Sequence, residues 1–420
     1  MINIIIPFPS TAAADAAVPL SNEDDCLRTL NCFGVHVNVI MSLFVIRCPA
    51  IAKVCLIKNR KNLFLSAALF NKLSFIRLNT HISNNNMVRE GVLPPAESGE
   101  FIAKNAQHVK IHEAGLEKLC EEMLPSITNK LEIPDTGADI IHPDKDHDKA
   151  ADWVFVADAL NFCFWSYSGA QKWTVDGHSG YYALEAALAR AIKNGIDITN
   201  PKYYSKITED ELRSIMKGDN EATIPLFEQR VSVLHEVGSI LLEKYNGTFE
   251  TCLKEANKSA VKLLEIIVKN FPCFRDEATF KGQKVALYKR AQILVADLWN
   301  FFGGTGWGEF KDIDKMTMFA DYRVPQVLVY FGALSYTDEL MEKLKKDILL
   351  PSGSEEEVEI RGCSIHAVEL LKKRIEEKLA GRSVEVPNSS LIDYYLWCYR
   401  RKYADAMETI PFHKTLGIYY

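Results

Sequence analysis

From Glu113 onward the sequence is a series of segments with helical periodicity, and this pattern limits the fold more than any other feature. Leu116, Leu119 and Met123 recur at the spacing of one helical face, and similar segments follow along the chain. No sustained alternation of apolar and polar residues predicts long strands, and no β-α-β rhythm appears. The pattern predicts a mainly α-helical, multi-helical single domain.

Turn and capping residues predict where these helices end. We expect Pro125 to end the first helix, and Thr208 and Glu211 have the spacing of a capping box. The acid-rich region 351–357 is typical of a turn between helices. The expected helices are 113–124, 152–165, 183–194, 212–217, 225–245, 259–271, 288–302, 337–346, 364–379 and 390–403.

Residues 1–86 differ in composition from the rest of the chain. Between Cys26 and Arg89 there is no Asp or Glu, while Lys and Arg recur. The apolar run 37–46 is about half as long as a bilayer requires, so we expect no membrane-spanning helix. A basic, acid-poor leader is typical of mitochondrial targeting, but the acids before Cys26 favour a poorly ordered extension or sequence outside the functional protein. We therefore expect a helical domain at 87–420 in a cytoplasmic protein.

Composition and motifs disfavour several classes of function. The net charge of −6 weighs against broad, non-specific binding of nucleic acid. The ten cysteines lack the spacing of zinc ligands, and the common phosphate-binding, dinucleotide-binding and hydrolase motifs are absent. His142 and His147 lie in an acidic loop without repeated ligand spacing. We therefore expect no metal site and no cofactor.

The segment 308–332 combines charged and aromatic residues with apolar sequence. It contains Phe310, Asp312, Asp321 and Arg323, and apolar runs interleave or follow them. Because buried charge is costly unless it is paired or used, such a segment is typical of a pocket wall. The alternative is a loop with surface acids and one structural Asp–Arg pair.

Two further apolar segments contain acids. Asp393 lies among apolar and aromatic residues of the last expected helix, where Tyr394 and Cys398 share a face. Asp158 lies in the aromatic segment 152–165. It belongs either to a core helix, bonded to the backbone, or to an aromatic wall that stacks on a flat ligand. Chain order leaves open which of these acids meet.

Several segments, in this order along the chain, resemble the queuosine salvage protein family. The resemblance runs from about Leu93 to the last residue and leaves 1–86 outside. The segments are DALNFCFW (158–165), SGYYAL (179–184), YKRAQILVADLW (288–299), FKDI (310–313), TMFADYRVPQVL (317–328), EVEIRGCS (357–364), DYYLW (393–397) and IPFHK (410–414).

The resemblance implies a mainly helical fold, similar to that of helix-hairpin-helix DNA glycosylases. It also implies a small-molecule partner, queuosine 5′-monophosphate, whose N-glycosidic bond the family hydrolyses. The products would be ribose 5-phosphate and the 7-deazaguanine base queuine, which then becomes available for insertion into tRNA. We expect no direct contact with nucleic acid and no membrane partner.

The resemblance also implies which residues contact the substrate. Phe310 and Asp312 carry over from FKDI, and Asp393, Tyr394 and position 398 carry over from the last helix. Members of the family read DYYLWD, whereas this chain has Cys398 in place of the second acid. The alternative function is therefore a catalytically weakened protein that binds deazaguanine nucleotides.

A second departure lies in the early loop, where the family tends to have a histidine. Alignment on Pro143 places Asp139 at that position and His142 three residues later. His142 is accordingly our candidate contact from this loop.

The chemistry of the reaction indicates roles for these residues. Breaking the bond builds positive charge on the sugar, which a carboxylate stabilises, and a carboxylate also activates the attacking water. Queuine has carbon in place of N7, so protonation at N7 cannot help the base to leave. The candidate acids are Asp393, Asp312 and Asp321, and we expect Asp312 to recognise the base.

The remaining candidates supply stacking, nucleophilic and cationic groups. We expect Phe310 and Tyr394 to stack or pack on the base. Cys398 replaces a carboxylate only if its pKa is lowered. The phosphate requires cationic donors, for which the candidates are Lys289, Arg290, Arg323 and His413.

Overall fold

The computed structural model describes residues 89–135, 143–144 and 146–420. The chain divides into two units, Met1–Asn84 and Asn85–Tyr420, and all of the described residues belong to the second. The extension predicted at 1–86 and the candidate contact His142 lie outside the described residues. Both stay predictions.

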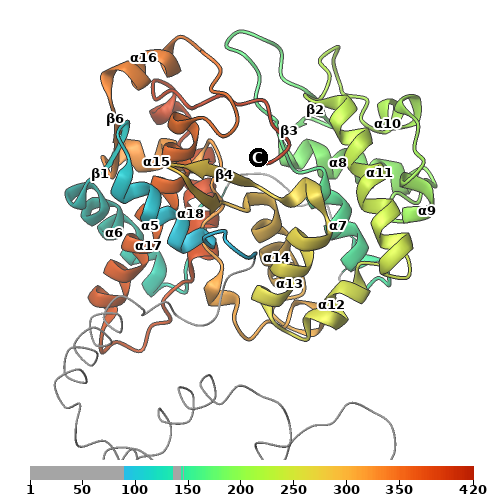
Figure 1. The fold of residues 1–420 in the computed structure, drawn as a ribbon, viewed down its shortest axis with the longest axis horizontal. Coiled ribbons are helices and arrows are strands. Elements are labelled where there is room, and N and C mark those ends of the chain that lie inside the picture. Colours follow the sequence, from blue (N-terminus) through green and yellow to red (C-terminus); the bar gives the residue numbers. More distant parts are fainter. Residues whose placement is uncertain (1–88, 136–142, 145) are drawn as a thin grey trace, which may run out of the picture. The chain divides into compact units, whose positions relative to one another are not determined.

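Fourteen α-helices form most of the regular structure of the described residues, which confirms the prediction of a mainly helical fold (Figure 1). The similarity to helix-hairpin-helix glycosylases stays a prediction. In chain order the helices are α5 (Pro95–Asn105), α6 (Glu113–Thr128), α7 (Ala150–Ala159), α8 (Tyr181–Lys193), α9 (Pro201–Tyr204), α10 (Glu209–Ile215), α11 (Phe227–Lys244), α12 (Glu250–Ala256), α13 (Ala260–Asn270), α14 (Lys289–Phe301), α15 (Val324–Tyr330), α16 (Asp338–Lys345), α17 (Glu355–Leu379) and α18 (Ser389–Lys402).

Strands in the described part of the chain are short and form three antiparallel pairs. Four 3₁₀ turns, η1 (Pro272–Phe274), η2 (Gly306–Gly308), η3 (Ile313–Lys315) and η4 (Asp405–Met407), connect longer elements. The pairs are β1 (Val109–Ile111) with β6 (Leu334–Tyr336), β2 (Thr174–Val175) with β3 (His178–Ser179), and β4 (Glu277–Phe280) with β5 (Gln283–Ala286).

Helix ends agree with the sequence at one predicted cap and differ at two other places. Thr208 and Glu211 form the predicted capping box, in which each side chain accepts from the backbone N–H of the other. Pro125 does not end α6, which continues to Thr128, because a proline in the last turn removes only one backbone hydrogen bond. The expected turn at 351–357 is wrong in its second half. There the acids of the first turn of α17 suit the positive end of the helix dipole.

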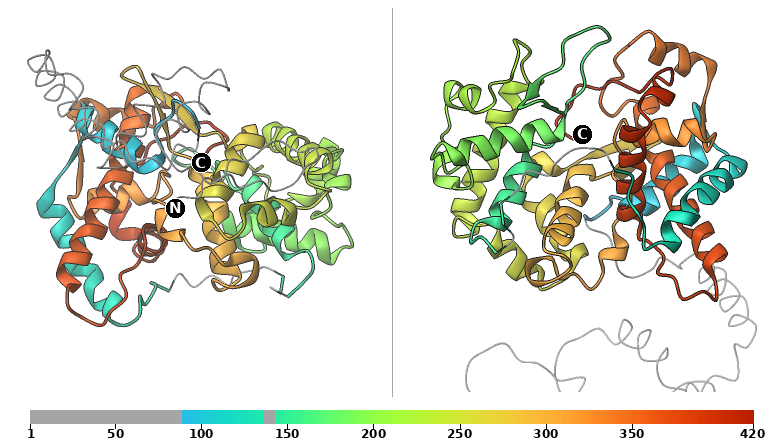
Figure 2. Two further views of the ribbon diagram at one scale, coloured as in Figure 1. Left: turned by 60° about the horizontal axis from the view of Figure 1, so that its bottom comes forward. Right: turned by 180° about the vertical axis from the view of Figure 1, so that it is seen from behind.

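The helices pack into two hydrophobic cores. The first joins α7, α8, α11, α13 and α14, and the second joins α5, α6, α15, α17 and α18. Figures 1 and 2 show the first group, green to yellow, beside the second, cyan and orange to red, in views from the front and from behind. Buried side chains typical of the first core are Phe155, Leu234, Ile267 and Leu294, and those of the second are Leu116, Val327, Ile365 and Leu396.

Two buried arginines fix the chain where α7 ends. Arg290 donates to the carbonyl groups of Asp158 and Ala159, and Arg230 donates to those of Leu160 and Phe162. The last carbonyl groups of a helix lack partners inside the helix, so these bonds satisfy them in a buried setting. The helix predicted at 152–165 therefore stops at Ala159.

Close helix contact in the second core depends on one glycine. Gly362 on α17 faces α5, and a Cβ atom added there would lie 2.4 Å from Ile102 Cδ1. Because no side chain fits at that distance, the glycine is required for α5 and α17 to pack together.

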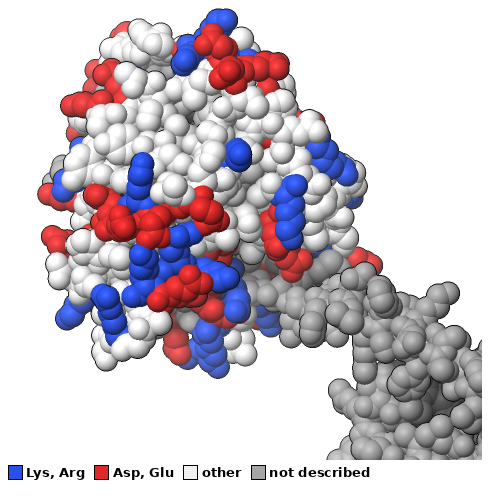
Figure 3. Space-filling view, turned by 90° about the vertical axis from the view of Figure 1, so that its left-hand side faces the viewer, with Lys and Arg blue, Asp and Glu red and all other residues white. Residues whose placement is uncertain are grey.

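The surface carries mixed charge on the face that bears α6 and α16. Figure 3 shows basic and acidic side chains interspersed there, without one large area of a single sign. Binding along a nucleic-acid backbone needs a continuous basic surface, which this face lacks. None of the helices in the described residues has the length and apolar character that a membrane span requires.

Candidate active site

Five acidic side chains meet between the two cores, and we call this group the acidic cluster. Asp297 interacts electrostatically with Asp158, Glu185 and Asp393, and Asp393 interacts in turn with Asp321. The first three come from α14, α7 and α8, whereas Asp321 precedes α15 and Asp393 lies on α18. The cluster therefore unites elements of both cores, which is a common position for a ligand site.

Asp393 lies deep in this cluster. It is 5% exposed, and its Oδ1 accepts the backbone N–H of Phe319 at 3.0 Å. Burial raises the pKa of Asp393 well above its ordinary value, and the charge of Asp321 raises it further. Its environment therefore favours the protonated form of Asp393.

Asp321 has an environment that favours its charged form more strongly. Its Oδ1 accepts the backbone N–H groups of Arg323 and Val324 at 2.9 and 2.8 Å, where α15 begins. Burial raises the pKa of Asp321, but the charge of Lys289 and the two N–H groups oppose that rise. Two neighbouring acids with different environments are able to take the acid and the base role separately.

Lys289 supplies positive charge to the cluster from the first residue of α14. Its ammonium is attracted by Asp321, Asp158 and Asp393, although burial lowers its pKa. Its backbone N–H donates to Asp276 Oδ2 at 2.9 Å, which fixes the start of the helix. The structure therefore brings the predicted residues Lys289 and Asp393 together.

Two of the other three acids contain unsatisfied oxygens. Asn161 donates to Asp158 Oδ1 at 3.2 Å, and the Tyr181 hydroxyl donates to Glu185. In the described part of the chain, Asp158 Oδ2 and Glu185 Oε2 are buried without a hydrogen-bond partner. Burial raises the pKa of Glu185 to about 8 and that of Asp297 to about 7. The cluster thus presents hydrogen-bond acceptors that the protein itself does not use.

Aromatic rings lie beside the acids. Tyr394 and Trp397 of α18 are stacked, with ring centroids 6.3 Å apart and an angle of 17° between the planes. Tyr182 meets Trp397 edge-on at 5.7 Å, and Arg401 lies 4.7 Å from the centroid of the Tyr182 ring. Asp297 interacts with Tyr394, which connects this aromatic group to the cluster. Rings in such a position suit a flat heterocycle.

Cys398 is buried beside Tyr394. It is 1% exposed, and burial raises the pKa of its thiol to about 11. Its side chain is hydrogen-bonded to Tyr394, one turn away on the helix. The condition under which this thiol replaces a carboxylate, a lowered pKa, is therefore not met.

Asp312 is occupied by contacts with α13. Its carboxylate accepts from the Ser259 hydroxyl at 2.7 Å and from the backbone N–H of Ala260 at 2.6 Å. These contacts are those of a residue that caps a helix start. The acids that interact with Asp393 include Asp321 and Asp297, and Asp312 is not among them. A substrate contact at Asp312 stays a prediction.

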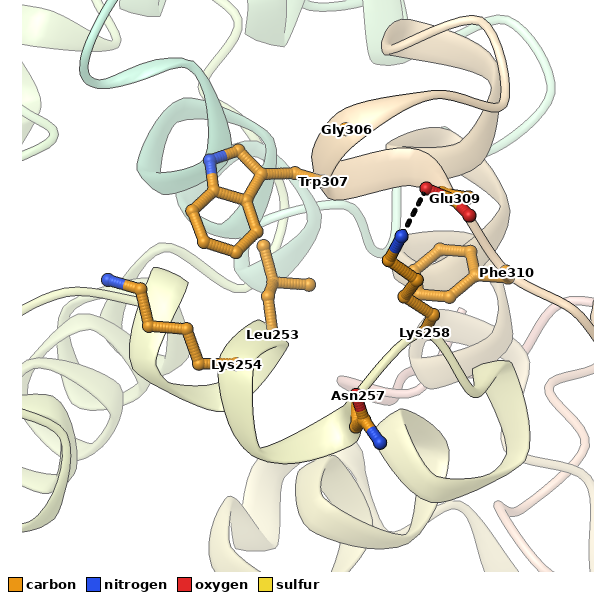
Figure 4. A pocket seen from close by; sticks show the side chains of 8 residues that line it. All are labelled: Leu253, Lys254, Asn257, Lys258, Gly306, Trp307, Glu309 and Phe310. Atoms are coloured by element: carbon orange, nitrogen blue, oxygen red, sulfur yellow. Dashed lines mark hydrogen bonds and ion pairs between the residues drawn. The ribbon is translucent and has the colours of Figure 1, made fainter.

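Phe310 lines a separate surface pocket between α12 and η2, shown in Figure 4. Lys258, which also lines the pocket, pairs with Glu309 at 2.6 Å, and Lys254 lies 5.4 Å from the centroid of the Trp307 ring. The pocket has a volume of about 160 Å³, below the range typical of sites that enclose a whole small ligand. The predicted contact of Phe310 with the base stays a prediction.

Arg323, two residues after Asp321, lies near a second arginine, Arg400. Its Nη1 donates to Gln326 Oε1 at 3.0 Å, and Arg400 Nε donates to the same oxygen, also at 3.0 Å. Burial lowers the pKa of Arg400 to about 10, and the charge of Arg323 contributes to this shift. Arg323 also lies 4.3 Å from the centroid of the Phe412 ring. Two arginines that share one amide oxygen as their acceptor are a candidate anion site.

One group in the described part of the chain has the spacing of metal ligands. His108, Glu355 and Glu359 have ligand atoms within 4.8 Å of one another. However, Glu359 accepts backbone N–H groups from residues 107–109, and Glu355 pairs with Lys281. These contacts give the acids structural partners, so we assign no metal to them.

Glu185 is the member of the cluster that the sequence analysis missed. It lies in an Ala/Leu-rich helix, where a single acid resembles the polar face of an amphipathic helix. Asp297 and Arg290 carry the same ambiguity, because both lie in a helix of mixed polarity. The available signal was the position of Glu185, four residues after Tyr181 and directly after the SGYYAL segment.

The comparisons with known proteins agree with the family resemblance of the sequence. The family model described as queuosine salvage protein matches residues 141–420. A Bos taurus protein named queuosine 5′-phosphate N-glycosylase/hydrolase is 47% identical over 341 residues, which is 79% of this chain and 100% of that protein.

Proteins with the same name from other organisms are also similar. The Mus musculus protein is 44% identical over 78% of this chain and 99% of its own length. The Sphaerobacter thermophilus protein is 36% identical over 76% of this chain and 95% of its own length. This chain therefore belongs to the queuosine salvage protein family.

Proposed function

We propose that this protein is a glycosyl hydrolase that cleaves the N-glycosidic bond of queuosine 5′-phosphate and releases queuine. The relatives that match this chain in sequence over nearly their whole length carry that activity in their names. The observation that carries the proposal in the structure is the buried pair Asp321 and Asp393 with Lys289 between the two cores. A role in supplying queuine for tRNA follows from the chemistry of the product.

Asp321 is the proposed carboxylate that faces the sugar. As the bond between C1′ and the base nitrogen breaks, positive charge develops on the ribose. Asp321 favours the ionised form more than Asp393 does, because Lys289 and two backbone N–H groups stabilise its charge. A preorganised carboxylate in a water-poor site stabilises this developing cation and accepts a proton from the attacking water.

Asp393 is the proposed acid. Its raised pKa keeps it protonated, so it is able to give a proton to the departing deazaguanine. In the balanced step, the C1′–N bond breaks and a bond from water oxygen to C1′ forms. One proton of the water passes to Asp321, and the proton of Asp393 passes to the base. Exchange with solvent then restores both acids.

The 5′-phosphate is proposed to bind at Arg323 and Arg400. Gln326 Oε1 holds both guanidinium groups, and Gln326 is itself fixed because its amide donates to Ile410 O at 2.5 Å. Arg323 follows Asp321 by two residues, so the anion site and the sugar-facing acid belong to one turn of chain. Bidentate guanidinium groups suit phosphate oxygens.

The test is an incubation of the purified protein with queuosine 5′-monophosphate, followed by chromatography for queuine and ribose 5-phosphate. Asp393→Asn is the matched variant, because its amide oxygen still accepts the N–H of Phe319. We expect release by the native protein and a loss of about 10²–10⁴-fold in the variant. Unimpaired release by Asp393→Asn removes this residue from the chemistry. Tight binding of queuine without any release supports the binding-protein alternative.

A further variant tests the phosphate site. Arg400→Met should raise KM for the nucleotide more than it lowers kcat, because the phosphate does not react. Equal KM values for the two proteins exclude Arg400 from the site.

A further inference from the structure

Three acids of the cluster have no role in the proposed bond cleavage. Asp158, Glu185 and Asp297 come from α7, α8 and α14, and all belong to the side of the first core. Asp158 is fully buried and Glu185 is 4% exposed. Buried acids without a structural or chemical task are costly, so their presence calls for a ligand.

The local structure stabilises these acids only in part, because the hydrogen bonds from Asn161 and Tyr181 and the charge of Lys289 do not outweigh the effect of burial on the pKa of Asp158 and Glu185. Asp158 is the second-last residue of α7, where the negative end of the helix dipole disfavours a carboxylate. Arg290 is near, but it directs its Nη atoms to the backbone carbonyl groups of Asp158, Ala159 and Cys273. Its charge therefore caps α7 and does not form an ion pair with a carboxylate of the cluster.

Two oxygens show where a ligand would bind. Asp158 Oδ2 and Glu185 Oε2 are buried, and among the described residues neither has a hydrogen-bond partner. Both acids interact with Asp297, which is only partly buried, so water-sized molecules reach the group. The oxygens therefore point to a missing donor that carries positive charge.

We propose that Asp158 and Glu185, with Asp297 between them, bind a cationic amine that the substrate carries on its base. This inference rests on the proposed function. Queuine differs from simple 7-deazaguanine by a side chain joined through a secondary amine, which is protonated at neutral pH like other aliphatic amines. The ammonium supplies two N–H donors, one for each unsatisfied oxygen.

The placement of the subsite agrees with that of the reaction. Asp297 interacts with Asp393 as well as with Asp158 and Glu185, so one side chain connects the two halves of the cluster. An elongated ligand with its base beside Asp393 would thus extend its side chain toward Asp158 and Glu185. These two acids determine specificity and do not take part in bond cleavage.

The first test uses the native protein and two nucleotides. One is queuosine 5′-monophosphate, and the other is 7-cyano-7-deazaguanosine 5′-monophosphate, in which a neutral nitrile replaces the cationic side chain. Because the nitrile cannot donate hydrogen bonds to the two acids, kcat/KM should favour queuosine 5′-monophosphate by about tenfold or more. Equal kcat/KM values for the two nucleotides overturn the proposal.

The second test uses Glu185→Gln, which keeps the shape of the side chain and removes its charge. The ratio of kcat/KM values for the two nucleotides should fall by about tenfold or more. Asp158→Asn should lower the ratio as well. Circular dichroism shows whether each variant folds, and Asp158→Asn replaces Glu185→Gln in this test if Glu185→Gln does not fold. An unchanged ratio in a folded variant contradicts the proposal.

Glu369→Gln is the matched control. Glu369 is a partly buried acid on α17 whose Oε1 accepts from Ser389 at 2.7 Å, and burial raises its pKa as well. Its neutralisation should leave the ratio of the two nucleotides within about twofold of the native value. A fall in this control equal to that in Glu185→Gln would mean that the change in ratio is not specific to the cluster.

Failure of the proposed function is distinguishable from failure of this subsite. If the native protein hydrolyses neither nucleotide, the proposed function fails, and calorimetry with the free bases then tests the subsite alone. Tighter binding of queuine than of 7-deazaguanine, with the difference lost in Glu185→Gln, supports the subsite. Equal binding of the two bases overturns it.

Discussion

Two groups of buried charge in this protein are built in opposite ways. In the first, Arg361 pairs with both oxygens of Asp276, at 2.9 and 2.5 Å, and with Glu357 at 3.0 Å. We call these three residues the paired network. Although burial opposes it, the two acids raise the pKa of Arg361 above its ordinary value. The acidic cluster, in contrast, has more acids than cations and leaves two oxygens unsatisfied.

The difference indicates which group is structural and which is functional. A buried charge that is fully paired needs nothing from outside the protein, whereas an excess of buried acids is stable only as protonated groups or with a ligand. The paired network also supports the cluster on two sides. Asp276 accepts the backbone N–H of Lys289, and Arg361 donates to the carbonyl group of Ala320, next to Asp321.

The largest expected effect is the loss of activity in Asp321→Asn. The amide oxygen keeps the two backbone bonds at the start of α15, but the negative charge opposite the sugar is lost. We expect kcat to fall by about 10²–10⁴-fold, with the free energy of unfolding little changed. Chromatography for released queuine measures kcat, and urea unfolding measures the free energy of unfolding.

The same substitution in the paired network should act on stability. Asp276→Asn leaves Arg361 buried with one partner fewer, and breaking a buried pair costs about 3–5 kcal/mol. Urea unfolding measures this loss. We expect kcat of the folded enzyme to change by less than about tenfold. If Asp276→Asn were stable but inactive, the assignment of the paired network to structure and of the acidic cluster to function would be wrong.

The sequence predicted the helical fold well because helical periodicity is local. Amphipathic spacing and caps such as Thr208 depend on a few neighbouring residues. Asp158, Asp321 and Asp393 also stood out, as acids inside apolar segments. Their convergence depends on how α7, α14 and α18 pack across two cores, and no local pattern encodes that packing.

Two residues show the limits of transferring roles by resemblance. Asp312 and Asp321 both follow an aromatic residue by two positions, in FKD and FAD, so their motifs look alike. In the structure Asp321 interacts with Lys289 and Asp393, while Asp312 caps α13. Burial and contacts distinguish the two acids, and residue spacing does not.

The pH dependence of stability offers a third test. Burial raises the pKa of Glu185 from 4.5 to about 8, so between these values the folded protein holds a proton that the unfolded chain releases. The contribution of Glu185 to stability is therefore complete below the unfolded pKa and is lost as the pH rises to about 8. Glu185→Gln removes this dependence.

The expected result is a relative gain of the variant at alkaline pH. Relative to that of the native protein, the free energy of unfolding of Glu185→Gln should rise by about 1.4 kcal/mol per pH unit between pH 5 and pH 8. Urea unfolding at several pH values measures the difference. If the difference in the free energy of unfolding between the two proteins stayed constant across this range, Glu185 would be ionised in the folded state.

A smaller effect is expected at Asp312. Asp312→Ala removes the acceptor for Ser259 and Ala260, and loss of a helix cap costs about 1 kcal/mol. If capping is its whole role, kcat/KM of the folded protein changes by less than about tenfold. Complete loss of queuine release in a folded variant would instead support the contact with the base that the family resemblance implies.

The smallest expected effect concerns Cys398, although the resemblance places an acid at this position. Burial raises the pKa of its thiol to about 11, so at neutral pH the side chain is a small uncharged group hydrogen-bonded to Tyr394. Cys398→Ser keeps the size and the hydrogen bond, and kcat/KM should stay within about threefold of the native value, measured between pH 6 and pH 9. A large loss in Cys398→Ser would require a reactive thiolate, which this environment opposes. Because Asp393 already interacts with position 398 and the cluster has more acids than cations, a further acid there would add to that excess, and Cys398→Asp should therefore not increase turnover.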